Sequence, residues 1–299
     1  MIFDQFKYLE TENYELFRQF SARFAGESCE RSWANLLLYQ DSYHWQYKVI
    51  ENRLWIASFE QAYLFFPLGG FVAPEILGTY FQKFADRFGR DAVLGDVPEE
   101  YFREFPEAGS YLEFEFDPDE ADYIYDLEHL QTLSGSKLRK RRNQVRQFDR
   151  EYEDCWFMKS ITFEMLDEII AFAGKQSRLY WHEESGLEEK RSFDRLKTVW
   201  QYPGVGLEGI ALYVNDSLVG FSIYSPLQEN LADIHFEKAD HSYTGCGAKL
   251  TALLTEHLLA KKYRFMNREQ DLGDEGLRQA KRALDPDHLY CRASITALK

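Results

Sequence analysis

The stretch from residue 231 to residue 247, LADIHFEKADHSYTGCG, decides the predicted fold. Its first seven residues alternate in polarity, which predicts a β-strand with two different faces. One face would carry Ala232, Ile234 and Phe236, and the other Leu231, Asp233, His235 and Glu237. Three ionisable groups on one strand face favour a cleft in which His235 or Glu237 takes a proton from a nucleophile. The alternative is a solvent-facing strand with an acid–histidine pair.

A loop with Gly245 and Gly247 follows this strand, and a helix with leucines on one face follows the loop. The first turn of a helix offers free N–H groups and a partial positive charge, so these glycines are candidates for binding a phosphate. A plain turn and helix cap would give the same pattern.

Working outward, the elements around this stretch occur twice along the chain. Strands at 208–214 and 218–225 precede it, and a strand at 264–268, a short helix at 275–283 and a strand at 289–295 follow it. The same order occurs earlier, in strands at 46–50, 54–58 and 63–68, a helix from Pro74, a strand at 92–94, a short helix after Pro98 and a strand near 111–116. This pseudo-repeat predicts two tandem α/β domains with mixed sheets. The acidic joint at 116–120 predicts a division into residues 1–118 and 119–299.

Polar residues gather where the predicted strand 264–268 ends. In open α/β sheets, ligands bind at this edge. The carboxylates of Glu269 and Asp271 are candidates for holding a cationic amino group, whereas Arg268, Arg278 and Lys281 are candidates for holding phosphate or carboxylate. Asn267 and Asp233 complete the predicted substrate-binding set. A surface network of salt bridges is the alternative.

Composition and charge exclude several classes of protein. The 299 residues carry a net charge of −15 and are 16% aromatic, so a disordered chain and a duplex-DNA-binding protein are both disfavoured. The four cysteines lie far apart and form no Cys/His cluster, so neither a metal nor a redox cofactor is expected. No apolar run approaches the ~20 residues of a membrane span, and the N-terminus does not read as a signal peptide. We therefore expect a cytoplasmic protein.

One basic segment stands out from the acidic background. Residues 134–151 are predicted to form a helix, and a binding role for it would involve Lys137, Arg139, Lys140, Arg141, Arg142 and Arg146. Such a concentration of positive charge attracts a polyanion. An exposed structural helix with a charged face is the alternative.

Several segments together carry a family resemblance. These are 235–240 with the glycine loop, 267–273 with 276–281, the N-terminal 35–43 and 65–69, and the basic 134–143. They resemble the C-terminal domain of phosphatidylglycerol lysyltransferases and the stand-alone bacterial DUF2156 proteins. The glycine loop is similar to the Q/R-x-x-G-x-G/A loop of GCN5-related N-acyltransferases, with Ser242 in place of Gln or Arg.

The resemblance implies two tandem GCN5-related acyltransferase-like domains, as in the Fem aminoacyltransferases. It implies transfer of an aminoacyl group from aminoacyl-tRNA to an acceptor, either a small molecule or a lipid headgroup. It also implies a donor site in the second domain and a tRNA-contacting role for the basic helix. A CoA-dependent N-acyltransferase and a non-catalytic module that binds a small cationic metabolite remain as alternatives.

Overall fold

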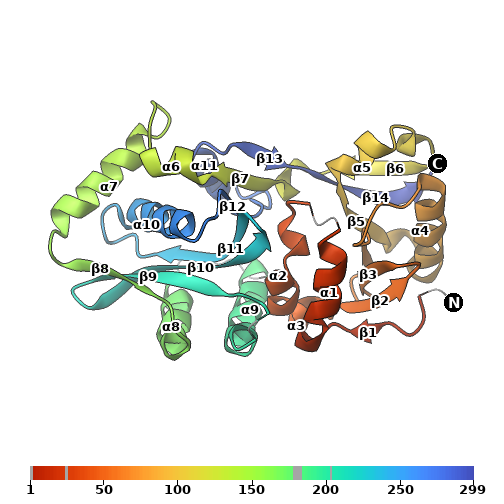
Figure 1. The fold of residues 1–299 in the computed structure, drawn as a ribbon, viewed down its shortest axis with the longest axis horizontal. Coiled ribbons are helices and arrows are strands. Elements are labelled where there is room, and N and C mark those ends of the chain that lie inside the picture. The colour runs from red at the N-terminus through yellow and green to blue at the C-terminus, as the bar shows by residue number, and fades with distance from the viewer. Residues whose placement is uncertain (1–2, 24–25, 178–183, 203) are drawn as a thin grey trace. The chain divides into compact units, whose positions relative to one another are not determined.

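The computed structural model describes residues 3–23, 26–177, 184–202 and 204–299. These residues form two compact units, Met1–Ala121 with Tyr290–Lys299 and Asp122–Leu289. Over the described residues, the structure contains two seven-stranded mixed sheets, drawn in Figure 1. The predicted two α/β domains are therefore present.

The first unit contains a sheet of order β1-β2-β3-β4-β5-β14-β6. Its strands are β1 (Lys7–Tyr8), β2 (Gln46–Ile50), β3 (Arg53–Ser58), β4 (Tyr63–Phe65), β5 (Val93–Pro98), β6 (Leu112–Phe116) and β14 (Arg292–Leu298). Its helices are α1 (Tyr14–Ser21), α2 (Trp33–Leu38), α3 (Gln40–Tyr43), α4 (Pro74–Phe88) and α5 (Glu99–Glu104). The apolar face predicted for α4 packs into the core of this unit through Leu77, Phe81 and Phe84.

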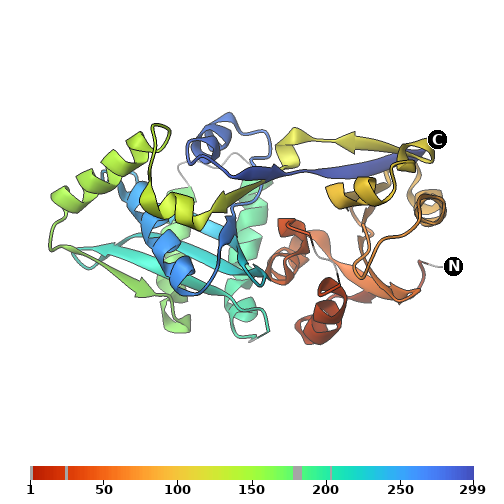
Figure 2. The same ribbon diagram turned by 45° about the horizontal axis from the view of Figure 1, so that its top comes forward.

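The last strand of the chain corrects the predicted domain division. The sequence assigned all of 119–299 to the second domain, but β14 pairs antiparallel with β5 on one side and β6 on the other (Figure 2). The first unit therefore obtains an inner strand from the C-terminus. The first boundary also moves from residue 118 to residue 121, because the strand that begins at Asp122 belongs to the second sheet.

A buried ionic network ties β14 to its own unit. Asp96 on β5 accepts a hydrogen bond from Ser28 Oγ at 2.6 Å and forms an ion pair with Arg31. Arg292, the first residue of β14, lies 3.5 Å from Asp96 and donates to Ser28 Oγ at 2.7 Å. The side chains of Arg31, Asp96 and Arg292 are at most 5% exposed. One buried carboxylate thus serves two buried guanidinium groups.

The second unit contains a sheet of order β13-β7-β12-β11-β10-β9-β8. Its strands are β7 (Asp122–Asp126), β8 (Trp156–Ser160), β9 (Glu208–Val214), β10 (Ser217–Gln228), β11 (Leu231–Ala239), β12 (Phe265–Asn267) and β13 (His288–Tyr290). Its helices are α6 (Leu127–Thr132), α7 (Arg139–Glu151), α8 (Leu166–Ser177), α9 (Glu184–Trp200), α10 (Cys246–Ala260) and α11 (Glu275–Arg282). Strands β7 and β8 are additions to the predicted set.

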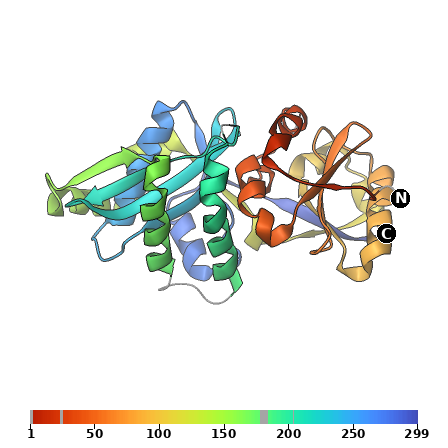
Figure 3. The ribbon, with the colours of Figure 1, turned by 90° about the horizontal axis from the view of Figure 1, so that it is seen from below.

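The two faces of the second sheet are covered by different helices. Leu250 and Leu254 of α10 and Phe148 of α7 share a buried cluster with Ala232 and Ile234 of β11. On the other face, Phe172 of α8 and Phe193 of α9 pack against Phe221. Figure 3 shows α8 and α9 lying across that face.

A β-bulge in β11 overturns the predicted alternation. Ile223 pairs with Phe236 and Tyr224 pairs with Ile234, so His235 is an extra residue in the ladder. Beyond the bulge the faces exchange. Phe236 stacks on Phe193 of α9 at 4.2 Å between ring centroids, and Glu237 reaches toward Thr251 of α10. The prediction that Phe236 shares a face with Ala232 and Ile234, and Glu237 a face with Asp233, is therefore wrong.

Candidate active site

The candidate site lies where β11 and β12 stop pairing. These parallel strands pair only through residues 231–233 and 265–267, after which β12 ends and β11 continues to Ala239. We call the region beyond Asp233 and Asn267 the splay. Two side-chain pairs cross it: Glu237 with Arg268 at 2.7 Å, and His235 with Glu269 at 3.5 Å. The splay therefore brings together four of the residues predicted for the site.

Asp233, His235 and Glu269 form one group, which we call the buried trio. His235 Nδ1 lies 3.6 Å from Asp233 Oδ2 and 3.5 Å from Glu269 Oε1. The side chains of His235 and Asp233 are fully buried, and that of Glu269 is 22% exposed. On the other side of the ring, Nε2 lies 2.8 Å from Ser225 Oγ of β10. This last contact fixes the orientation of the imidazole.

Glu237 and Arg268 form the second group of the splay. Arg268 Nη2 donates to Glu237 Oε1, and Thr251 Oγ1 lies 3.5 Å from the same oxygen. Among the described residues, neither Glu237 Oε2 nor Arg268 Nη1 has a hydrogen-bond partner, although both atoms are buried. The pair thus offers one acceptor and one donor to a substrate.

Arg141 of α7 belongs to the surroundings of this pair. Burial, and after it the positive charge of Arg268, lowers the pKa of the Arg141 guanidinium. Burial also raises the pKa of Tyr125 on β7, whose ring lies 6.0 Å from the Arg268 guanidinium carbon. Arg141, which was predicted to contact tRNA, is only partly exposed and donates to the carbonyl oxygen of Ala280 at 3.4 Å.

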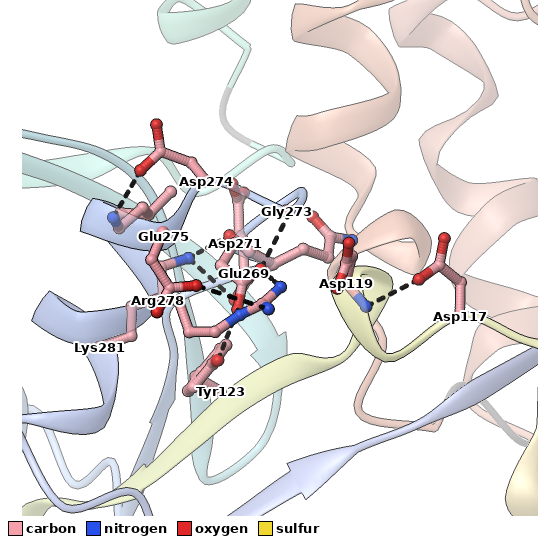
Figure 4. A network of polar contacts seen from close by, with 12 residues as sticks. Asp117, Asp119, Tyr123, Glu269, Asp271, Gly273, Asp274, Glu275, Arg278 and Lys281 are labelled. Atoms are coloured by element: carbon pink, nitrogen blue, oxygen red, sulfur yellow. Dashed lines mark hydrogen bonds and ion pairs between the residues drawn. The ribbon is translucent and has the colours of Figure 1, made fainter.

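The loop after β12 is held by three residues that were predicted to bind substrate. Arg278 donates to Asp271 from Nε at 2.9 Å and from Nη2 at 2.7 Å, and Tyr123 OH donates to Asp271 Oδ2 at 2.6 Å (Figure 4). The hydrogen bond from Arg278 keeps the pKa of Asp271 well below its usual range. Lys281 Nζ donates to the carbonyl oxygens of residues 268 and 269 at 2.6 and 3.0 Å, and to that of Gln270.

These contacts indicate a positioning role for Asp271, Arg278 and Lys281. They fix a loop in which Glu269 and Leu272 have left-handed backbone conformations, with φ of 57° and 50°. Asn267 assists by accepting a hydrogen bond from the Glu269 amide at 2.6 Å. The loop therefore presents Arg268 and Glu269 to the splay.

The glycine loop is covered by α7. A Cβ atom on Gly245 would lie 2.3 Å from the carbonyl oxygen of Gln144 and 3.2 Å from Phe148 Cβ. Tyr152 OH accepts a hydrogen bond from the Thr244 amide at 3.2 Å, and Asp149 forms a 2.7 Å ion pair with Lys249. Gly245 is thus needed for the close approach of α7 to the start of α10, and Gly247 is the second residue of that helix.

We expect Gly245→Ala to destabilise the second unit. The φ of Gly245 is 77°, which strains a residue with a Cβ atom by about 1–2 kcal/mol, and the contact with Gln144 must also be relieved. The total loss should be about 2–3 kcal/mol, measured as a shift of the denaturant midpoint. Gly247→Ala is the matched control, because its Cβ atom would meet only Ala239 at 3.8 Å. Equal stability of the two variants would contradict the packing argument.

The basic segment forms a helix that begins later than predicted. Helix α7 starts at Arg139 rather than at residue 134. Lys137 forms a 2.7 Å ion pair with Asp285, and Arg142 donates to the carbonyl oxygen of Leu133. The exposed cations of the predicted tRNA set on α7 are Arg139, Lys140 and Arg146.

Comparison with known proteins identifies the family. The family described as "Phosphatidylglycerol lysyltransferase, C-terminal" matches residues 21–292. The chain belongs to this family. The match spans both units and supports an acyltransferase of the aminoacyl-transferring type. A curated relative, an uncharacterized protein of Mycoplasmoides gallisepticum, is 24% identical over 189 residues, and the match spans 56% of its length.

Solved structures show the same fold. A conserved protein of unknown function from Bacteroides thetaiotaomicron matches with a TM-score of 0.87 and 27% identity over 100% of both chains. The structure of L-PGS from Bacillus licheniformis matches with a TM-score of 0.64 and 15% identity, over 98% of this chain and 93% of that one. A tandem GNAT protein from the clavulanic acid biosynthesis pathway matches with a TM-score of 0.52 and 12% identity over 98% of both chains.

The predicted family and fold are thereby confirmed. The fold consists of two tandem GCN5-related acyltransferase-like units with mixed sheets. Among the residues that the structure describes, none of the helices combines the length and apolar character that a bilayer crossing requires.

Proposed function

We propose that the protein transfers an aminoacyl group from aminoacyl-tRNA to a nucleophilic acceptor, and that the reaction takes place at the splay. The observation that supports this most directly is the Glu237–Arg268 pair. It combines a buried carboxylate oxygen and a buried guanidinium nitrogen, Glu237 Oε2 and Arg268 Nη1, which have no hydrogen-bond partner among the described residues. Acyl transfer requires a base that removes a proton from the nucleophile and a cation that stabilises the negative charge on the carbonyl oxygen. The Glu237–Arg268 pair places both groups side by side.

In the proposed step, the acceptor hydroxyl or amine attacks the ester carbonyl carbon of the donor. The new bond forms as the acceptor's proton passes to Glu237 Oε2. Arg268 stabilises the negative charge that develops on the carbonyl oxygen. The bond from the carbonyl carbon to the ribose oxygen then breaks, and that oxygen leaves with the proton from Glu237. Atoms and charge balance without another reactant.

The packing of α7 favours tRNA over a CoA thioester as the donor. In the CoA alternative, Gly245 and Gly247 would bind the pyrophosphate at the start of α10. That position lies against Gln144 and Phe148 of α7, and the Thr244 amide already has Tyr152 as a partner. The outer side of the same helix carries Arg139, Lys140 and Arg146, which suit a polyphosphate backbone.

We expect the triple variant Arg139→Ala/Lys140→Ala/Arg146→Ala to bind charged tRNA about tenfold more weakly or worse, with a smaller salt dependence of affinity, because up to three phosphate contacts are lost. Filter retention of a total aminoacyl-tRNA pool at several salt concentrations measures both quantities. The matched control removes three exposed cations elsewhere, Lys83, Arg103 and Lys262, and should bind normally.

Acetyl-CoA titrated into the same protein tests the alternative donor. Saturable CoA binding without tRNA retention would overturn the proposal in favour of a CoA-dependent enzyme. Binding of a small cationic metabolite with neither donor bound would favour the non-catalytic module. For a protein that retains tRNA, transfer to glycerol phosphate esters and to soluble amines would separate a lipid headgroup from a small-molecule acceptor.

A further inference from the structure

The buried trio has a geometry that the proposed acyl-transfer step does not use. Its three ligand atoms, from Asp233, His235 and Glu269, lie within 4.8 Å of one another. The two distances from His235 Nδ1, 3.5 and 3.6 Å, exceed those of a normal hydrogen bond, and Nδ1 is buried without a hydrogen-bond partner among the described residues. The His235 Nδ1 atom therefore faces the carboxylates of Asp233 and Glu269, and the three atoms leave room for a cation.

The spacings to the histidine nitrogen favour a metal ion over an ammonium group. Nitrogen and oxygen ligands about 2.0–2.2 Å from a tetrahedral Zn²⁺ lie about 3.4 Å from one another. Acceptors about 2.9 Å from an ammonium nitrogen would lie about 4.7 Å apart. The two distances from His235 Nδ1, 3.5 and 3.6 Å, match the first value, and the two carboxylate oxygens lie within 4.8 Å of each other.

The other side of the imidazole agrees with this interpretation. A histidine that binds a metal through one nitrogen usually donates its remaining N–H to a neighbouring oxygen, which fixes the tautomer. Ser225 Oγ lies 2.8 Å from His235 Nε2 and can accept that hydrogen bond. With Nε2 protonated, Nδ1 carries its lone pair toward the two carboxylates. Burial of the His235 and Asp233 side chains restricts their rotation, so the ligands are held in place.

We propose that Asp233, His235 and Glu269 form a three-ligand binding site for a divalent metal ion such as Zn²⁺. One carboxylate from β11, one from the loop after β12 and the imidazole of the bulge residue supply the ligands. A fourth position of a tetrahedral ion remains for water or substrate. The site goes beyond the proposed function, because the acyl-transfer step is assigned to Glu237 and Arg268 and needs no metal.

The test measures metal content directly. The full-length protein is incubated with Zn²⁺, dialysed against metal-free buffer and assayed by inductively coupled plasma mass spectrometry. We expect about one retained equivalent, falling at least tenfold in His235→Gln and in Glu269→Gln. Loading with Co²⁺ should give a visible absorption band that both variants lose. His288→Gln is the matched control, since His288 also lies beside a carboxylate, that of Asp287 at 3.0 Å, but at an exposed position.

Two further variants keep the result interpretable. Ser225→Ala leaves all three ligands in place and should weaken Zn²⁺ binding by about 10–100-fold, even if the ligand variants fold poorly. Glu237→Gln should retain Zn²⁺ fully while losing transfer, so failure of the metal site and failure of the proposed reaction give different results. Zinc content that is negligible, or equal in the wild type and His235→Gln, overturns the proposal. Binding of ethylammonium that depends on Glu269, without retained zinc, overturns it in favour of an ammonium pocket.

Discussion

Glu237→Gln is expected to lower kcat/KM for aminoacyl transfer by about 10²–10⁴-fold, the usual contribution of a positioned general base. The amide of glutamine has the shape of the carboxylate, and its oxygen can still accept the hydrogen bond that Arg268 donates to Glu237 at 2.7 Å. The amide cannot take the proton of the acceptor. Single-turnover transfer from charged tRNA measures the effect. Binding of tRNA should stay within about twofold, since the exposed cations of α7 are unchanged.

The control for Glu237→Gln is another carboxylate of the same unit. Glu208 lies on β9, pairs with Lys261 at 2.6 Å and is about half exposed, so Glu208→Gln should transfer normally. Arg268→Lys adds a second test, because a lysine keeps the charge but loses the planar pair of donors. Unchanged transfer in Glu237→Gln would show that the base lies elsewhere, and His235 would then be the next residue to test.

Asp96→Ala is expected to destabilise the first unit by about 3–5 kcal/mol, because removing one partner of a buried ionic network leaves uncompensated charge. Arg31 and Arg292 would both lose their carboxylate. Hydrogen exchange should accelerate in peptides from β5 and β14, whereas peptides from β10 and β11 keep their protection. This comparison separates the first unit from the second without assuming one unfolding transition.

The exposed Asp91 provides the control for this prediction. It lies just before β5, and Asp91→Ala should leave exchange in β5 and β14 within the experimental error. A variant of Arg292 tests the same network from β14: Arg292→Met keeps the length of the side chain and removes its charge, so Asp96 still has Arg31. The loss in the free energy of unfolding should be smaller in Arg292→Met than in Asp96→Ala. The reverse order would contradict the view that two cations share one carboxylate.

Much of the second unit could be predicted from the sequence, because its elements carry strong local signals. The strands predicted at 208–214 and 218–225, the leucine face of α10 and the polar residues at the end of the predicted strand 264–268 are local patterns, and each lies where it was expected. The order of these elements also led to the tandem fold. Local periodicity was therefore sufficient for two α/β units, but not for the place of β14 in the first sheet.

The geometry of the site depended on contacts that no local pattern contains. An extra residue at His235 reversed the faces of Phe236 and Glu237, and a bulge is visible only in the pairing of β11 with β10. Asp271, Arg278 and Lys281 were selected by their charge as substrate-binding residues. In the structure, Arg278 donates to Asp271 and Lys281 donates to the backbone of the loop after β12, so all three hold this loop in place. The signal for Glu269 was its place after a strand, whereas its proximity to Asp233 and His235 required the parallel pairing of β11 with β12.

The position of β14 has a consequence for synthesis on the ribosome. The first unit lacks its strand between β5 and β6 until residues 292–298 have been made, after the whole of 122–289. At about 5–20 residues per second, this segment alone takes roughly 10–30 seconds. Throughout that interval the facing edges of β5 and β6 have no partner, and unpaired edges recruit other strands. We therefore expect the nascent N-terminal half to be prone to aggregation until residues 292–298 have left the ribosome.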